Sequence, residues 1–137
     1  MLQFLTQEWV QWVRSIPLDP EVLRRNWDKA MHMSTQPVAA RLFKYAKDID
    51  LTALAKKAQE RELAVKVVIE SVLMLSERTI RLQWRETMYD GANVERDTTK
   101  YTGEFEFILR KPANQQEFDA NPLGIWMARF TWSKDLV

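Results

Sequence analysis

The sequence offers few side chains with the chemistry of an active site or a metal site. It contains one histidine, His32, and no cysteine. A single histidine without cysteine cannot assemble a histidine-built zinc site, a thiolate metal site or a cysteine nucleophile, and it leaves no ready serine-type triad. His32 lies at the expected end of a helix, where a favourable interaction with the helix dipole explains its presence. We therefore expect no catalytic, cofactor-binding or metal-binding residue, and no cofactor.

Acidic residues on the expected strands are the other candidates for acid–base chemistry. Glu70, Glu104 and Glu106 alternate with apolar residues and are expected to point to solvent. Glu86 differs, because it falls in register with the apolar positions of its strand, such as Trp84. It lies either on the concave side of the sheet, where a general acid or base would need to be, or beside water at a strand end. We expect the second arrangement.

The composition excludes several classes of function. The chain has 20 basic and 19 acidic residues and a net charge of +1, which provides no broad field for nucleic acid, so we expect no direct nucleic-acid binding. Its three glycines are too few for a glycine-rich phosphate loop. No window of about 18 uncharged apolar residues occurs, so the sequence as given contains no membrane span and no recognisable signal peptide.

Helical periodicity occupies the N-terminal part of the chain. Apolar residues recur at helical spacing over 2–16, 20–32, 37–49 and 51–58, which predicts four helices. The second is expected to start at Asp19-Pro20, because aspartate caps free N–H groups and proline fits the first turn. Asp50 is expected to cap the fourth. The first helix begins at Met1 without a capping residue.

Period-two alternation follows and predicts four strands over 65–75, 79–88, 101–110 and 124–133. Asp90-Gly91 supplies a turn after the second strand, and a polar stretch through Asp119 is expected to cross over to the fourth. The residues expected to share one face of each strand are Val65, Val67, Ile69, Ser71, Leu73 and Leu75; Ile80, Leu82, Trp84 and Met88; Tyr101, Gly103, Phe105, Phe107 and Leu109; and Trp126, Ala128, Phe130 and Trp132.

The order of helices and then strands indicates an α+β fold with segregated layers rather than alternating βαβ units. The strands are long, so the sheet must twist and curve strongly, and the helices are expected to pack on its concave face. We expect Trp9, Trp12 and Trp27 to be buried there against the aromatic rows of the strands. The prediction is N-terminal helices packed on a curved four-stranded antiparallel sheet, a nuclear-transport-factor-like cone, with residues 1–137 forming a single domain.

Two blocks of the sequence are distinctive enough to suggest a relationship. The first is WVRSIPLDP at 12–20, followed by Asn-Trp at 26–27, and the second is NPLGI at 121–125, running into FTWSKDL at 130–136. In the NPLG turn, proline fixes the backbone and glycine permits the close approach of another segment. With these blocks the chain resembles the TrbF family of conjugal transfer proteins, which is related to the eighth VirB component of type IV secretion systems. Met31 departs from the pattern, because relatives often carry an aromatic residue there.

The resemblance implies a non-enzymatic assembly component of a type IV secretion system that carries out conjugative DNA transfer. Such proteins have a short cytoplasmic tail, one transmembrane helix in the inner membrane and a periplasmic domain of the cone fold. Residues 1–137 would then be a periplasmic domain from which the tail and the helix have been removed, in keeping with the uncapped start at Met1. The implied partners are other type IV secretion components, and the inner membrane through the absent N-terminal helix.

Self-association is the second implication of the resemblance. Relatives associate through the first helix and the NPxG turn. This makes candidate interface positions of Gln7, Gln11 and Arg14, as exposed residues of the first helix, and candidate interface or interface-supporting positions of Asn121, Pro122, Leu123 and Gly124. Trp9 and Trp12 on the same helix would serve as aromatic anchors. We expect a homo-oligomer, a dimer or trimer, that is weak in solution and strengthened by membrane tethering. Arg14→Glu is expected to weaken self-association without unfolding the domain.

Two other functions fit the same fold. One is a small-molecule-binding or isomerase- or dehydratase-like enzyme, which requires a deep cavity with Glu86, Tyr101 or another polar group among apolar walls. This alternative fails if the cone is filled by aromatic residues that meet the helices: Trp84, Phe105, Phe107 and Trp126. The other is an effector or immunity protein, favoured if the natural gene begins at Met1 without a membrane helix.

Overall fold

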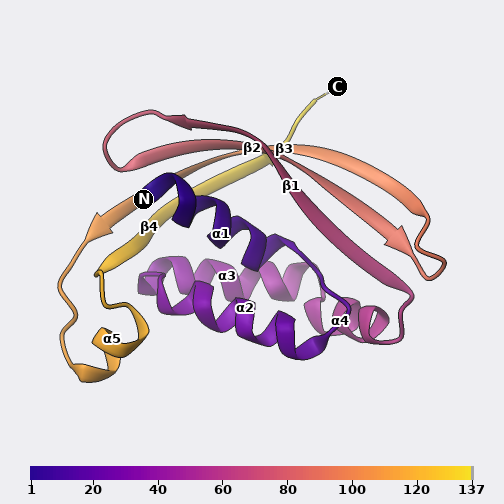
Figure 1. Ribbon diagram of the computed structural model, residues 1–137, viewed down its shortest axis with the longest axis horizontal. Helices are drawn as coiled ribbons and strands as arrows, with labels where there is room; N and C mark the ends of the chain where they lie inside the picture. Colours follow the sequence, from indigo (N-terminus) through magenta and orange to yellow (C-terminus); the bar gives the residue numbers. More distant parts are fainter. Residues whose placement is uncertain (137) are drawn as a thin grey trace.

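The structure is a computed structural model that describes residues 1–136. Four helices come first, then three strands, a short helix and a last strand (Figure 1). The elements are α1 (Leu2–Arg14), α2 (Pro20–His32), α3 (Gln36–Asp48), α4 (Leu51–Gln59), β1 (Leu63–Met74), β2 (Thr79–Asp90), β3 (Glu95–Leu109), α5 (Gln115–Ala120) and β4 (Ile125–Lys134).

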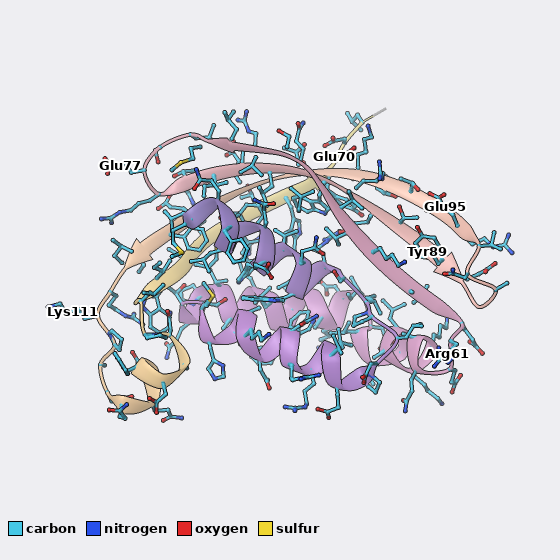
Figure 2. The ribbon with its side chains drawn as sticks, viewed as in Figure 1. Arg61, Glu70, Glu77, Tyr89, Glu95 and Lys111 are labelled. Atoms are coloured by element: carbon cyan, nitrogen blue, oxygen red, sulfur yellow. The ribbon has the colours of Figure 1, made fainter. Side chains whose placement is uncertain are left out.

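The strands form one antiparallel sheet in the order β1-β2-β3-β4. The sheet curves over the helices, with α1 directly beneath it and α2 and α3 below α1 (Figure 1). The predicted α+β architecture of N-terminal helices on a four-stranded antiparallel sheet is therefore confirmed. Side chains fill the space between the two layers, as Figure 2 shows.

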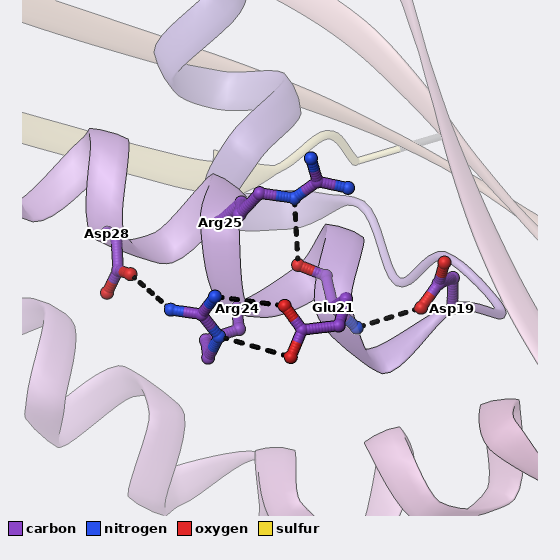
Figure 3. Close-up of polar contacts among 5 residues, drawn as sticks. All are labelled: Asp19, Glu21, Arg24, Arg25 and Asp28. Carbon is purple, nitrogen blue, oxygen red and sulfur yellow. Dashed lines mark hydrogen bonds and ion pairs between the residues drawn. The ribbon is translucent and has the colours of Figure 1, made fainter.

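The start of α2 follows the predicted capping chemistry. The Asp19 carboxylate accepts a hydrogen bond from the Glu21 N–H at 2.9 Å, and Pro20 occupies the first turn. Arg24 then bridges Glu21 and Asp28 at 2.9 and 3.0 Å, along one exposed side of the helix (Figure 3). These pairs are solvated, so they contribute little beyond local helix stability.

The core lies where α1 meets the middle of the sheet. Trp9 is fully buried, and its ring lies 5.9 Å from the ring of Phe105 and 5.2 Å from that of Phe130. Its indole N–H donates to the Ser34 hydroxyl at 3.3 Å, which satisfies the buried polar atom. Trp12 and Trp27 pack only against the margin of this core, so the prediction that all three tryptophans are buried holds fully for Trp9 alone.

A bulge in β4 changes which of its residues face the helices. Phe130 pairs with Phe105, but Met127 pairs with Phe107, which leaves Ala128 as an extra residue. An extra residue reverses the alternation, so Met127 joins the buried core, as does Ile125. The predicted common face of Trp126, Ala128, Phe130 and Trp132 is therefore wrong for its first two members.

β1 carries a second bulge, at Glu70. Ile69 pairs with Trp84, but beyond the bulge Val72 pairs with Leu82 on the concave side. Directly opposed residues share a face, so Leu73, opposite Arg81, lies on the convex side. The prediction of one face for all odd-numbered residues from Val65 to Leu75 is thus wrong after Ile69, because a one-residue insertion changes the face of every later side chain.

Three further predictions need correction. In β2, Thr87 is buried and Met88 is exposed, the reverse of the expectation. β3 begins at Glu95 rather than Tyr101. The crossover before β4 contains α5, whose first turn is capped by Asn114 accepting from the Glu117 N–H at 2.8 Å. A six-residue polar helix shows no apolar period, so periodicity could not reveal it.

Candidate functional site

The concave side of the sheet carries an ion pair between α1 and β2. Arg14 donates from Nε to Glu86 Oε2 at 2.5 Å and from Nη2 to Glu86 Oε1 at 3.0 Å. The Trp84 indole N–H donates to the same carboxylate at 3.0 Å. The bidentate geometry is the strongest form of this pairing. Glu86 is thus nearly buried on the concave side, and the expectation that it lies beside water is wrong.

Aromatic rings surround the Arg14 guanidinium. Its central carbon lies 4.4 Å from the ring centre of Tyr101, 4.8 Å from Trp132 and 5.3 Å from Tyr45. Only 7% of Arg14 is exposed, so the prediction that it is an exposed residue of the first helix is wrong. We use the term cone interior for the residues Arg14, Tyr45, Trp84, Glu86, Tyr101 and Trp132.

Burial and charge oppose each other at Arg14. Burial disfavours the charged guanidinium, but the hydrogen bonds and charge of Glu86 outweigh it and hold the pKa of Arg14 above its ordinary value. Burial raises the pKa of the neighbouring Tyr45 to about 12, although the positive charge of Arg14 works against that increase. Both groups therefore keep one protonation state across the physiological range, Arg14 charged and Tyr45 neutral.

The inward carboxylate of Glu86 is already occupied by hydrogen bonds within the protein. Both Glu86 oxygens are bound by Arg14, and Trp84, Phe105 and Phe107 are fully buried around the centre of the sheet. The small-molecule alternative is expected to fail if Trp84, Phe105, Phe107 and Trp126 fill the cone. The first three of these residues pack with helix residues in the core. Trp126 is the exception, since its indole N–H donates to the Arg110 carbonyl at 3.0 Å outside the central cluster.

The outer side of α1 presents a different surface. Gln7 and Gln11 are half-buried, and the Gln11 side-chain amide donates to the Val67 carbonyl on the edge of β1 at 3.0 Å. Phe4 lies one turn before Gln7 and Glu8, and 61% of it is exposed. The sequence interpretation placed the aromatic anchors at Trp9 and Trp12, but Trp9 is inaccessible, and Phe4 is the exposed aromatic residue of this helix.

The NPLG turn divides into a rigid frame and an exposed tip. The Asn121 side-chain amide donates to the Ile125 carbonyl at 2.9 Å, and the Gly124 N–H donates to the Asn121 carbonyl at 3.1 Å. Gly124 has φ +64°, and a side chain there would collide with the Arg110 carbonyl. Pro122 and Leu123 are exposed, Leu123 by 61%, so they are the members of the motif that can contact a partner.

A groove runs between the α2–α3 junction and α5. It measures about 760 Å³ and is lined by residues that include His32, Thr35, Arg110, Glu117 and Trp126. Phe118 projects from α5 and is exposed. His32 is exposed at this groove, and within residues 1–136 no group of His, Asp and Glu side chains is placed to hold a metal ion.

The seven predicted interface positions thus fall into three groups. Gln7 and Gln11 lie on α1, and Pro122 and Leu123 lie at the tip of the turn. The remaining three, Arg14, Asn121 and Gly124, are buried and hold the structure together. Phe4 and Phe118 were missed. An apolar residue outside the buried stripe of a helix is the sequence signal that would have found Phe4.

Comparison with a family model decides the relationship. The model described as VirB8 protein matches residues 1–135. The chain belongs to the VirB8 family. A search of curated proteins finds no match. The VirB8 family model covers the first block on which the TrbF resemblance rests and the second as far as Asp135, but it does not distinguish TrbF from other branches.

Solved structures of VirB8-type proteins share the fold at low sequence identity. A TrwG component of a type IV secretion system from Bartonella birtlesii superposes with a TM-score of 0.80 at 12% identity, covering 98% of this chain and 90% of that one. The VirB8 protein of Agrobacterium tumefaciens gives 0.78 at 13% identity, over 96% and 89%. TraE in complex with 2-(2-furyl)isonicotinic acid gives 0.75 at 14%, over 97% and 94%.

These similarities establish the fold. Together with the family model, they identify the chain as a VirB8-like component of the type IV secretion kind. In residues 1–136, no helix has the length and apolar character needed to cross a membrane.

Proposed function

We propose that this VirB8-family domain is a non-enzymatic, periplasmic assembly component of a conjugative type IV secretion system, related to TrbF. It acts through weak self-association and through contacts with other channel proteins. The observation that carries the proposal is the NPLG turn, in which buried Asn121 and Gly124 hold Leu123 out in solvent. A rigidly presented apolar side chain suits a binding surface, because little conformational entropy is lost when a partner covers it.

The cone interior supports the same proposal. A small-molecule enzyme of this fold needs an open, polar cavity, whereas here the inward carboxylate accepts hydrogen bonds from Arg14 and Trp84, and aromatic rings surround the Arg14 guanidinium. No observation among the described residues favours the isomerase or dehydratase alternative.

For the interface we propose Gln7 and Gln11 with neighbouring Phe4, together with Pro122 and Leu123. Arg14, Asn121 and Gly124 support these positions from within, since they are buried. Tethering to a membrane raises the effective concentration, so a weak contact in solution is sufficient for an oligomer in the cell.

Sedimentation equilibrium at high concentration tests the interface. We expect Leu123→Glu to weaken self-association, because a charge would have to be desolvated in the contact. Phe43→Glu is the matched control, because Phe43 is 67% exposed on α3 and lies outside the proposed surface. Circular dichroism should show both variants folded. Association of Leu123→Glu equal to that of the wild type would refute this interface.

Inner-membrane anchoring through a preceding helix belongs to the same proposal. A reading frame that extends upstream with a basic tail and about 20 apolar residues would support it. A frame that starts at Met1 would instead favour the effector or immunity alternative.

A further inference from the structure

The outer edge of β1 differs between its two halves. β1 is an edge strand, so within residues 1–136 one side of it has no neighbouring strand. Near the end of α1 this side is covered, because Val65 exchanges backbone hydrogen bonds with Ile16 and the Val67 carbonyl accepts from Gln11. Over residues 71–75 no backbone hydrogen bond from outside the hairpin covers it in the described chain.

The uncovered half is also apolar. Its sequence is Ser-Val-Leu-Met-Leu at 71–75, without a charge, a proline or a glycine. All of these side chains are exposed, Leu73 by 51%. Natural sheets usually protect such an edge with lysine, proline or a bulge, because an unprotected edge pairs with another strand. Here the bulge lies at Glu70, before the apolar stretch rather than within it.

The hydrogen-bonding direction of this edge can be derived from the hairpin. The Leu75 N–H donates to the Thr79 carbonyl, so Leu75 and, by alternation, Leu73 direct their backbone groups to β2. Val72 and Met74 therefore direct their N–H and C=O groups outward, over a stretch of roughly 17 Å from residue 71 to 75.

We propose that this edge pairs antiparallel with the same segment of a second copy of the chain, about a two-fold axis at Leu73. Val72 of one copy then exchanges both N–H···O bonds with Met74 of the other, and symmetry repeats the pair. Leu73 meets Leu73 on the convex side, and Ser71 meets Leu75. The result is one continuous sheet across two copies.

Charge and symmetry favour a second copy over an unrelated strand. The paired stretch 71–75 is itself uncharged, so no like charges face each other within it. Antiparallel pairing brings Glu70 near the turn of the other copy, which carries both Glu77 and Arg78. Figure 2 places Glu77 at the tip of the hairpin and Glu70 further along the strand, at either end of the uncharged stretch.

This contact goes beyond the proposed function, whose interface is on α1 and the NPLG turn. Two separate surfaces that each bind a second copy allow more than a closed dimer to form. The two proposals can fail separately, because each has its own variants.

Disulfide trapping tests the register, since the chain has no cysteine of its own. Leu73 faces itself at a non-hydrogen-bonded position, where the Cα atoms of opposed residues lie about 4.5 Å apart, within disulfide range. We expect oxidised Leu73→Cys protein to run as a covalent dimer, and Phe43→Cys, an exposed control on α3, to remain monomeric. A mixture of Ser71→Cys and Leu75→Cys chains should crosslink to each other more than either does alone.

A charge-complementation experiment tests the same axis without cysteine. Leu73→Lys and Leu73→Glu each place two like charges together at the axis, so each variant alone should lose this contact in sedimentation, and an equimolar mixture should regain it. Crosslinking of Leu73→Cys should persist in a Leu123→Glu background. Absence of the Leu73→Cys dimer, or crosslinking at Phe43→Cys to the same extent, would overturn the proposal and leave a different partner strand as the occupant.

Discussion

The cone interior and the hairpin end of the molecule use aromatic and apolar residues in opposite ways. We define the hairpin end as the end of the sheet with the β1–β2 hairpin, the start of α1, α5 and the NPLG turn (Figure 1). In the cone interior, rings enclose a paired charge. At the hairpin end, Phe4, Leu73, Phe118 and Leu123 are exposed around a firmly bonded backbone. We therefore predict that changes in the cone interior affect stability and that changes at the hairpin end affect association.

The largest expected effect is on stability, from Arg14→Met. This change leaves the Glu86 carboxylate nearly buried and unpaired, which should cost about 3–5 kcal/mol of unfolding free energy. Chemical denaturation measures it. Arg24→Met, at an exposed pair of α2, is the control and should leave the midpoint unchanged. The double variant Arg14→Met/Glu86→Gln should recover much of the loss, and a double variant as unstable as the single one would contradict the role of the ion pair.

The same geometry revises the expectation for Arg14→Glu. It would place two carboxylates side by side in the cone interior, so we expect unfolding rather than a folded domain with weaker association.

Gly124→Ala should have the next largest effect on stability, because it distorts the hydrogen-bonded backbone of the NPLG turn at the hairpin end. Its φ of +64° and the collision with the Arg110 carbonyl should cost about 1–3 kcal/mol. Thermal unfolding measures the loss. An unchanged Tm would show that the NPLG turn adapts readily, and that the contrast between a rigid frame and an exposed tip is wrong.

The pH dependence of stability caused by Tyr45 tests the cone interior with a smaller expected effect. Its pKa is raised from 10.0 to about 12 by burial, so the neutral ring stabilises the fold fully below the unfolded pKa, and this contribution is lost as pH rises towards 12. Phenylalanine cannot ionise. Between pH 10 and pH 12 the Tyr45→Phe variant should therefore lose less unfolding free energy than the wild type, by on the order of 1–2 kcal/mol. Urea unfolding as a function of pH measures the difference, with Tyr89→Phe as the control for loss of a tyrosine.

The smallest effect on stability is expected from Leu123→Gln. An exposed side chain at the tip of the turn should change the unfolding free energy by less than about 0.5 kcal/mol. A loss above 1 kcal/mol, roughly the level of a buried change, would mean that the tip contributes to the fold and would remove the contrast between the two regions.

The limits of sequence-based prediction follow from particular residues. Helices and strands were predicted from their periods, and Asp19 and Asp50 were correctly identified as caps. The faces of β1 and β4 were wrong beyond the bulges at Glu70 and Ala128. A bulge adds a residue without changing the composition, so alternation in the sequence cannot reveal it.

The candidate site was predicted only in part. Pro122 and Leu123 of the NPLG motif are exposed as an interface requires, but Arg14 was placed on the wrong side of α1. Its partner Glu86 is 72 residues away in the chain, and no local pattern links them.

The sequence by itself determined the order of the four main helices and the four strands, the antiparallel sheet and the VirB8-family relationship, because periodicity, caps and the two distinctive blocks are local properties of the chain. Only the tertiary structure decided that the inward carboxylate of Glu86 is matched by Arg14, whose guanidinium is surrounded by aromatic rings. It also decided that, among the described residues, half of the β1 edge receives no backbone hydrogen bond from outside the hairpin. Both depend on which distant segments meet in space, since burial, pairing and exposure are properties of contacts rather than of single residues.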